Sequence, residues 1–268
     1  TKSKPCHPRP KAKLAHELGG DRFMTDDYRL EIDGYCPICN KSARFIAKDR
    51  WLRGSLLCQT CKNGSVPRER ALALVLDRKR PNWRDLKIHE SSPSNRGISI
   101  KLREECENYV GSHYVPDSAF GQVVRGLRNE SLENQTFADQ SFDIVVTLDV
   151  FEHVYEPGKM IKEIYRTLKP GGLYICTFPI RKYQVESHKQ RVRRSSDGSL
   201  VYLEPPEIHG NPTSDEGALV TYDYGYDIHL MLGYWAPFSV EILRFLNRSM
   251  GILGEYTEVI TCEKPLDA

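Results

Sequence analysis

The sequence has no long apolar run and little excess charge. None of its apolar stretches reaches the 18 or so residues that a membrane-spanning helix needs, and no segment has the pattern of a signal peptide. These absences argue against a membrane-spanning or secreted protein and predict a cytoplasmic one. The 268 residues, 40% of them hydrophobic, suffice for one full domain plus a small module.

The net charge of +2 hides an uneven distribution. Residues 1–84 carry 19 Lys and Arg against 9 Asp and Glu, whereas residues 85–268 carry 19 against 27. A basic amino-terminal part is typical of proteins that bind nucleic acid, a nucleotide-sugar, an acidic glycan or a membrane surface. A solvated basic tail explains the same distribution equally well.

Composition divides the chain into three parts. We interpret residues 1–32 as a basic tail and lead-in, and residues 33–84 as a cysteine module with a linker helix. Residues 85–268 form the main domain, which a segment at 181–234 interrupts. A loop of that length is uncommon without a function.

The main domain alternates apolar strand patterns with amphipathic helix patterns, which predicts a mostly parallel sheet covered on both faces by helices. Helices are predicted at 97–106, 158–168 and 239–250. Strands are predicted at 86–90, 108–112, within 121–132, and at 142–148, 173–179 and 256–262.

Two Cys-x-x-Cys pairs separated by eighteen residues predict a metal site formed by Cys36, Cys39, Cys58 and Cys61. Each pair brings two sulfurs to one ion, and two pairs complete a tetrahedron. Because four thiolates leave no position for substrate or water, the spacing favours a structural zinc over a catalytic zinc or a redox dithiol.

The most specific sequence pattern surrounds the fourth predicted strand, at 142–148. Phe142-Asp143 opens that strand, Asp149-Val-Phe-Glu152-His153-Val154 follows it, and Leu168-Lys-Pro-Gly-Gly172 follows the next helix. This combination resembles the class I S-adenosylmethionine-dependent methyltransferases, in particular the small-molecule group with D-x-x-E-H-V after strand four. The resemblance covers about residues 85–180 and the carboxyl-terminal elements. It implies a Rossmann-like, seven-stranded sheet with an antiparallel last strand, and a cofactor across the tips of the first four strands.

The resemblance also implies cofactor-binding residues, with one departure. The family pattern E-x-G-x-G-x-G is here Glu90-Ser-Ser92-Pro-Ser94-Asn-Arg96-Gly. Glu90 matches the acid that faces the cofactor's amino group. Hydroxyls of Ser92 and Ser94, the Arg96 guanidinium and the next helix N-terminus suit the methionine carboxylate. Either the loop is a variant that still binds, or cofactor binding has been lost.

Three further positions follow from the same resemblance. His113 occupies the place of the ribose-binding acid, and a surface histidine is the alternative interpretation. Asn129, Glu130 or Ser131 takes the adenine-side position, with Ser131 at the aligned site. Asp149 ends the fourth strand beside the cofactor.

Methyl transfer to a hydroxyl needs a base, and histidine suits neutral pH. His153, His209 and His229 are the candidates, although each could instead cap a helix or bond the backbone. The segment 181–234 is the predicted acceptor site, because its many tyrosines suit sugar rings or aromatic acceptors. A lid that packs its tyrosines against the sheet is the alternative.

We therefore expect an S-adenosylmethionine-dependent O-methyltransferase that contains structural zinc and acts on a small-molecule or glycan acceptor. If the basic segment 182–194 contacts the acceptor, we expect that acceptor to be anionic. Two alternatives remain. The basic patch also fits an RNA methyltransferase, whose binding would depend steeply on salt. The missing glycines also fit a binding module that kept the fold and lost the cofactor.

Overall fold

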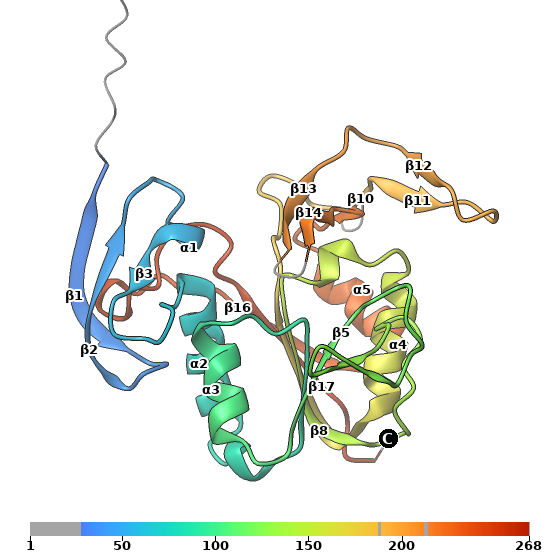
Figure 1. Cartoon of the computed structure of the whole chain (residues 1–268), viewed down its shortest axis with the longest axis horizontal. Helices are drawn as coiled ribbons and strands as arrows, with labels where there is room; N and C mark the ends of the chain where they lie inside the picture. The colour runs from blue at the N-terminus through green and yellow to red at the C-terminus, as the bar shows by residue number, and fades with distance from the viewer. Residues whose placement is uncertain (1–27, 187–188, 212–213, 268) are drawn as a thin grey trace, which may run out of the picture.

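The computed structural model describes residues 28–186, 189–211 and 214–267. Two units lie side by side in Figure 1: a small antiparallel sheet at the left, and a larger sheet with helices on both faces at the right. The expected basic tail, including Cys6, lies largely outside the described residues. No helix in the described ranges is long and apolar enough to cross a membrane.

The small unit is a three-stranded antiparallel sheet formed around the cysteine pairs. One Cys-x-x-Cys pair lies in the turn between the first two strands, and the other begins at the end of the third. Asn40 and Asn63 adopt positive φ of 52° and 57°, as Asn does more readily than most residues, and let both turns close tightly. Its elements are β1 (Leu30–Cys36), β2 (Lys41–Ala47), α1 (Leu52–Ser55) and β3 (Leu57–Cys58).

The large sheet has eight strands in the order β16-β17-β9-β8-β4-β5-β7-β6. The central strands β9, β8, β4, β5 and β7 are mutually parallel, and β17 is antiparallel to both its neighbours. Seven strands match the expected architecture, and the short β6 adds a hairpin at one edge. The strands are β4 (Ile88–Ser91), β5 (Tyr109–His113), β6 (Val123–Val124), β7 (Leu127–Asn129), β8 (Phe142–Leu148), β9 (Leu168–Thr177), β16 (Ser239–Leu243) and β17 (Val259–Glu263).

Helices cover both faces of this sheet because its central strands are apolar on both sides. On β8, Ile144 and Val146 pack into the core under α2 and α3, whereas Val145 packs into the core under α4 and α5. The predicted fold class, α/β with a Rossmann-like sheet plus a small cysteine module, is confirmed. The helices are α2 (Pro67–Lys79), α3 (Gly97–Glu105), α4 (Pro157–Thr167) and α5 (Ile228–Trp235), with one-turn 3₁₀ segments η1 (Trp83–Asp85), η2 (Phe151–His153) and η3 (Arg248–Met250).

The predicted helix at 239–250 is wrong. Residues 239–243 form β16, which pairs in antiparallel register with β17, and only Arg248–Met250 forms a helical turn. Val240 and Ile242 both pack against the core beneath α5, which is the period-two pattern of a strand.

The two units share one hydrophobic core. Side chains of the small sheet, such as Phe45, belong to the same buried cluster as α2, α3 and sheet residues such as Ile175. The buried Arg70 guanidinium lies over the Phe45 ring at 4.6 Å and donates to the carbonyls of Leu56 (2.9 Å) and Gly251 (2.6 Å). One side chain of α2 thus joins the small unit to the loop before β17.

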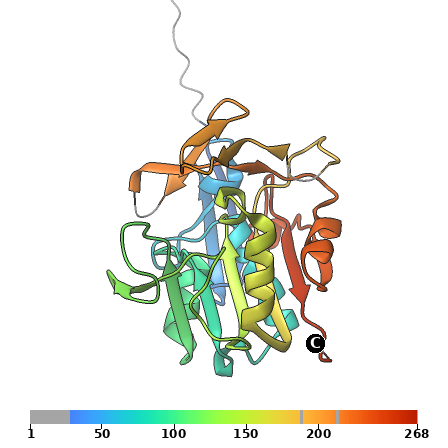
Figure 2. The same ribbon diagram turned by 90° about the vertical axis from the view of Figure 1, so that its right-hand side faces the viewer.

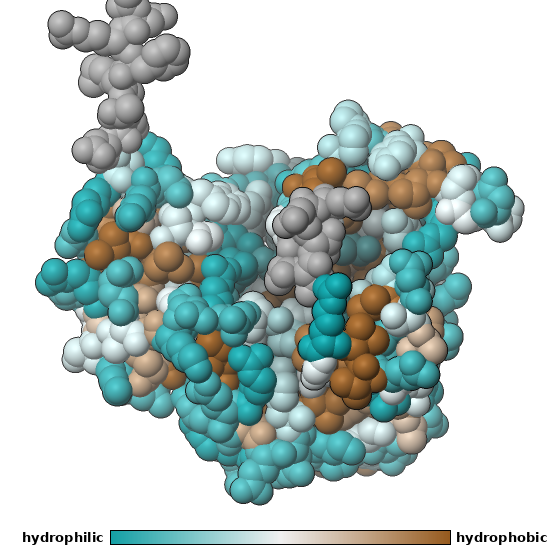
Figure 3. All heavy atoms as spheres, viewed as in Figure 1, coloured by the Kyte–Doolittle hydropathy of each residue, from teal (hydrophilic) through white to brown (hydrophobic). Residues whose placement is uncertain are grey.

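The described part of the predicted insertion 181–234 forms three two-stranded antiparallel sheets and then α5. In Figure 2 it lies across the upper edge of the large sheet, beyond the ends of the parallel strands. Apolar residues are visible at the upper right of Figure 3, where the insertion lies. The exposed apolar side chains of the insertion include Leu203 and Ile208. Its strands are β10 (Lys189–Gln190), β11 (Val192–Arg194), β12 (Leu200–Tyr202), β13 (Ile208–Asn211), β14 (Ser214–Leu219) and β15 (Tyr222–Asp223).

Candidate active site

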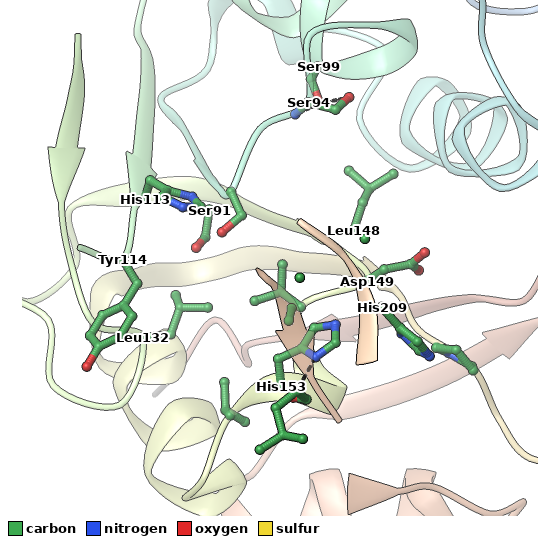
Figure 4. Close-up of a pocket in the computed structure, with 18 of the residues that line it drawn as sticks. Ser91, Ser94, Ser99, His113, Tyr114, Leu132, Leu148, Asp149, His153 and His209 are labelled. Carbon is green, nitrogen blue, oxygen red and sulfur yellow. Dashed lines mark hydrogen bonds between the residues drawn. The ribbon is translucent and has the colours of Figure 1, made fainter. Parts of the chain in front are cut away.

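A cavity of about 1450 Å³ lies where the parallel strands end. The carboxyl ends of β4, β5 and β8 and the segment after β7 form its floor, as the ligand sites of open parallel sheets require. The insertion supplies a second wall through β13 and β14, and the small unit supplies a third through residues such as Trp51 and Arg53. Figure 4 shows labelled lining side chains that come from strand ends, from the loop after β4, from α3 (Ser99) and from η2 (His153).

The loop after β4 presents a polar wall to the cavity. Ser92, Ser94 and Arg96, which the sequence analysis predicts as cofactor-binding residues, all line it. Ser92 has a positive φ of 58°, and the Ser94 hydroxyl donates to the Arg96 carbonyl at 3.2 Å. The Arg96 guanidinium pairs with the buried Glu69 carboxylate at 2.8 Å. The missing glycines are therefore replaced by a hydrogen-bonded serine loop that leaves the cavity open.

Glu90 lies beneath this wall and is not among the lining residues. It is fully buried, and its carboxyl group accepts hydrogen bonds from Ser99 Oγ (2.5 Å) and Tyr109 Oη (2.8 Å). Burial raises the pKa of Glu90 to about 7. The predicted contact of Glu90 with a cofactor amino group is thus shielded by Ser99, which does line the cavity.

The next two strand ends contribute one predicted residue each. His113 lines the cavity at the end of β5, and burial lowers the pKa of its imidazole, which favours the neutral form. Of the three adenine-side candidates, Ser131 and Glu130 line the cavity. The Asn129 side chain instead holds the backbone of the 115–119 turn. The Glu130 carboxylate is occupied by Arg128 and Thr136, which leaves Ser131 as the residue with donor capacity.

Asp149 lines the cavity, but two arginines of the amino-terminal part bind its carboxylate. Arg53 donates two hydrogen bonds to it at 2.7 and 2.6 Å, and Arg68 Nε lies 2.8 Å away. Burial opposes ionisation of Asp149, yet Arg53 and Arg68 outweigh it and hold the pKa of this carboxyl well below its usual range. Asp149 has a positive φ of 52°, which aspartate tolerates better than most residues. It therefore joins the cavity floor to the small unit.

Two of the three predicted histidines meet at the other end of the cavity. His153 follows β8, and His209 comes from β13 of the insertion; their rings lie 5.3 Å apart at 90° (Figure 4). Glu152 lies beside both, with Oε1 3.8 Å from His153 Nε2 and 3.7 Å from His209 Nδ1. Its carboxylate, followed by that of Glu207, raises the pKa of His209. Two imidazoles and one carboxylate thus form a potential proton-accepting or metal-binding group.

His229 does not join this group. It is exposed on α5, outside the cavity lining, with Nδ1 3.3 Å from the Tyr226 carbonyl. The tyrosines expected to contact an acceptor are also absent from the lining: Tyr222 and Tyr224 are buried, and Tyr202 and Tyr234 are exposed. The aromatic lining comes instead from Trp51, Tyr114, Phe120, Tyr155 and Tyr256.

Sequence reasoning missed several site residues. Arg53 and Arg68 flank the second cysteine pair, but nothing local indicates that they reach Asp149. Glu152 did carry a signal, because it belongs to the D-x-x-E-H-V segment.

The four predicted zinc ligands come together. The sulfurs of Cys36, Cys39, Cys58 and Cys61 all lie within 4.8 Å of one another, and all four cysteines are free. The Cys36 and Cys61 sulfurs are 3.5 Å apart, close to the edge of about 3.8 Å expected for tetrahedral zinc with Zn–S bonds of about 2.3 Å. The donor set fits a closed, structural zinc site.

Comparison with known proteins matches part of this chain to methyltransferases. Residues 99–176, from α3 to the end of β9, match a family described as a methyltransferase domain. A probable S-adenosylmethionine-dependent methyltransferase of Mycolicibacterium smegmatis is 33% identical over 55 residues, or 20% of this chain and 21% of that protein. A ubiquinone biosynthesis O-methyltransferase of Cereibacter sphaeroides is 38% identical over 50 residues, or 19% and 20%.

The chain thus matches about a fifth of the length of these curated relatives. Among solved structures, an S-adenosylmethionine-dependent methyltransferase from Mesorhizobium loti aligns with 72% of this chain and 98% of that chain, at 13% identity and a TM-score of 0.47. Over the residues that the family match covers, the comparisons support the predicted class, an S-adenosylmethionine-dependent methyltransferase.

Proposed function

We propose that this chain transfers a methyl group from S-adenosylmethionine to a hydroxyl of a sugar, a glycan or another small molecule. One observation carries the proposal: a single cavity contains the expected cofactor wall and the histidine pair. Its volume of about 1450 Å³ exceeds the roughly 300–1000 Å³ of a pocket for one small ligand, so a cofactor and an acceptor can occupy it together.

The chemistry of the floor fits each part of the cofactor. The hydroxyls of Ser92 and Ser94 and the Arg96 guanidinium suit a carboxylate, and the neutral His113 imidazole suits a ribose hydroxyl. Leu132, beside Ser131, offers an apolar surface to a purine. S-adenosylmethionine supplies a sulfonium methyl group, which an oxygen nucleophile displaces in line.

The histidine pair provides a place for the acceptor's proton. His153 Nδ1 lies 2.9 Å from the Leu219 carbonyl, which can only accept, so Nδ1 carries the proton and Nε2 has the free electron pair. Nε2 can take the hydroxyl proton as the oxygen attacks the methyl carbon. The Glu152 carboxylate then stabilises the resulting imidazolium.

Calorimetric titration with S-adenosylhomocysteine tests cofactor binding. We expect saturable binding by the zinc-loaded protein and roughly fivefold weaker binding by His113→Ala, because one hydrogen bond is worth about 1 kcal/mol. His229→Ala, an exposed histidine outside the cavity, is the matched control and should bind like the wild type. Absence of binding by folded wild-type protein would overturn the proposal in favour of a non-catalytic module.

The acceptor class is tested by measuring S-adenosylhomocysteine release with sugars, nucleotide-sugars and small phenols. We expect turnover with a hydroxylated small molecule that changes little with salt. Turnover with RNA alone, falling steeply as salt rises, would overturn the acceptor class.

A further inference from the structure

The Glu152 carboxylate is buried without a hydrogen-bond partner. Its side chain is 3% exposed, and within the described ranges neither oxygen has a donor within hydrogen-bond distance. A buried carboxylate normally carries several hydrogen bonds or a counter-ion, because its loss of hydration is costly. Its titratable neighbours include the two imidazoles, at 3.7 and 3.8 Å. The geometry leaves room for a group between these three side chains.

Each imidazole is already oriented by its other nitrogen. The Leu219 carbonyl holds His153 Nδ1, and the Glu207 carboxylate lies 3.1 Å from His209 Nε2. Glu207 is in turn held by Arg181 at 2.6 Å through both oxygens. His153 Nε2 and His209 Nδ1 therefore face Glu152 and are the nitrogens left to bind an ion, whose binding would displace any proton that His209 Nδ1 carries. Metal-binding histidines in proteins are usually oriented in this way.

The three donor atoms converge on one point. The Glu152 oxygen, His153 nitrogen and His209 nitrogen all lie within 4.8 Å of one another. Around a first-row ion with bonds of about 2.1 Å, such donors lie roughly 3.0–3.4 Å apart. Small rotations of the three side chains would bring the donor atoms to these separations. Because His153 and His209 line the cavity (Figure 4), the remaining coordination positions face it.

We propose that Glu152, His153 and His209 bind a divalent first-row transition-metal ion whose open positions take oxygen atoms of the acceptor. Two histidines and one carboxylate with open positions are an established donor set for such ions. The acceptor part of this inference rests on the proposed methyl transfer. An acceptor with two adjacent oxygens, such as a vicinal diol or a catechol, would chelate the ion. When the ion is bound, His153 Nε2 is its ligand and no longer the base, so the bound hydroxyl would lose its proton to water. Its oxygen would then bond the methyl carbon as the carbon–sulfur bond breaks, and the electron pair of that bond would stay on the thioether sulfur.

Titration with Mn²⁺, followed by electron paramagnetic resonance of the free ion, tests the site on the full chain. Mn²⁺ is a suitable probe because it competes poorly for the four cysteine sulfurs. We expect one Mn²⁺ per chain, and binding weakened by at least about 10- to 100-fold in Glu152→Gln and in His209→Ala. The matched controls, Glu156→Gln and His229→Ala, change exposed residues and should bind like the wild type.

Thermal melts of all variants separate loss of the site from loss of the fold. No Mn²⁺ binding by the wild type, or equal binding by folded Glu152→Gln and His209→Ala, would overturn the site. S-adenosylhomocysteine titration of the same samples distinguishes the two proposals. Retained S-adenosylhomocysteine binding without Mn²⁺ binding would refute the metal site alone, whereas Mn²⁺ binding without S-adenosylhomocysteine binding would refute the proposed function alone.

Discussion

Replacing Asp149 by Asn should destabilise the whole chain as well as alter its cavity. The Asp149, Arg53 and Arg68 side chains are only 19, 7 and 15% exposed, so the variant leaves two largely buried guanidinium groups without a counter-charge. Removing one partner of a buried ion pair costs about 3–5 kcal/mol. Asn tolerates the positive φ of this position and still accepts a hydrogen bond. We therefore expect the free energy of unfolding to fall by about 3 kcal/mol, the lower end of this range.

Urea unfolding of the zinc-saturated protein, followed by circular dichroism, measures this loss. A double-mutant cycle with Arg53→Met sharpens the test. In the Arg53→Met background the Asp149→Asn change should cost about 1–2 kcal/mol less, because only Arg68 then loses its partner. Asp197→Asn, in an exposed turn, is the control and should change the free energy of unfolding by less than about 0.5 kcal/mol.

Two results would refute the reasoning. Unchanged stability of Asp149→Asn would mean that the Arg53 contact does not join the two units. Strict additivity in the cycle would mean that Asp149 and Arg53 act independently. Either outcome would indicate that Asp149 does not contribute to stability through Arg53, and would leave only the cofactor contact that the sequence predicts.

Three further changes test other parts of the structure. The pKa of Glu90 is raised to about 7, so its protonated form stabilises the fold at low pH, and this contribution is lost as the pH rises through 7. As the pH rises from 5.5 to 8, the free energy of unfolding of Glu90→Gln, measured in urea, should therefore increase by about 2 kcal/mol relative to that of the wild type, at 1.36 kcal/mol per pK unit. Parallel pH profiles of the two proteins would contradict this. Cys58→Ser should abolish stoichiometric zinc in elemental analysis, and full retention would refute the ligand assignment. Gly251→Ala should lower stability by about 1–3 kcal/mol, because its Cβ would lie 2.7 Å from the Phe45 ring; Gly198→Ala, also at positive φ but in open space, should cost less.

Local patterns predicted much of the fold. The strand at 142–148 has the expected bounds, and the helix at 97–106 ends one residue earlier than expected. These elements are fixed by apolar periodicity and by glycine and proline at their ends, which are properties of short segments. The error at 239–250 arose because a short apolar segment fits both periods, and only pairing with β17 decides between them.

The site was less predictable because it depends on contacts between distant segments. Arg53 meets Asp149 across 96 residues, and His209 reaches His153 only because the insertion folds back over the strand ends. The tyrosines of the insertion misled the prediction for a related reason. Composition indicated aromatic surfaces, but whether Tyr224 faces a ligand or the core is set by packing around Phe151.

The shared core beneath α2 limits where this chain can be divided. A fragment that starts at residue 85 would keep all eight strands of the large sheet but lose α2, exposing apolar side chains such as Ile144 and Ile175 to water. It would also lose Arg53 and Arg68, and with them one wall of the cavity. Chimeras that exchange the cysteine-bearing part between related enzymes should therefore carry α2 and the 248–256 loop with it. A cut in the linker after α2 would leave each half with part of this apolar cluster exposed to water.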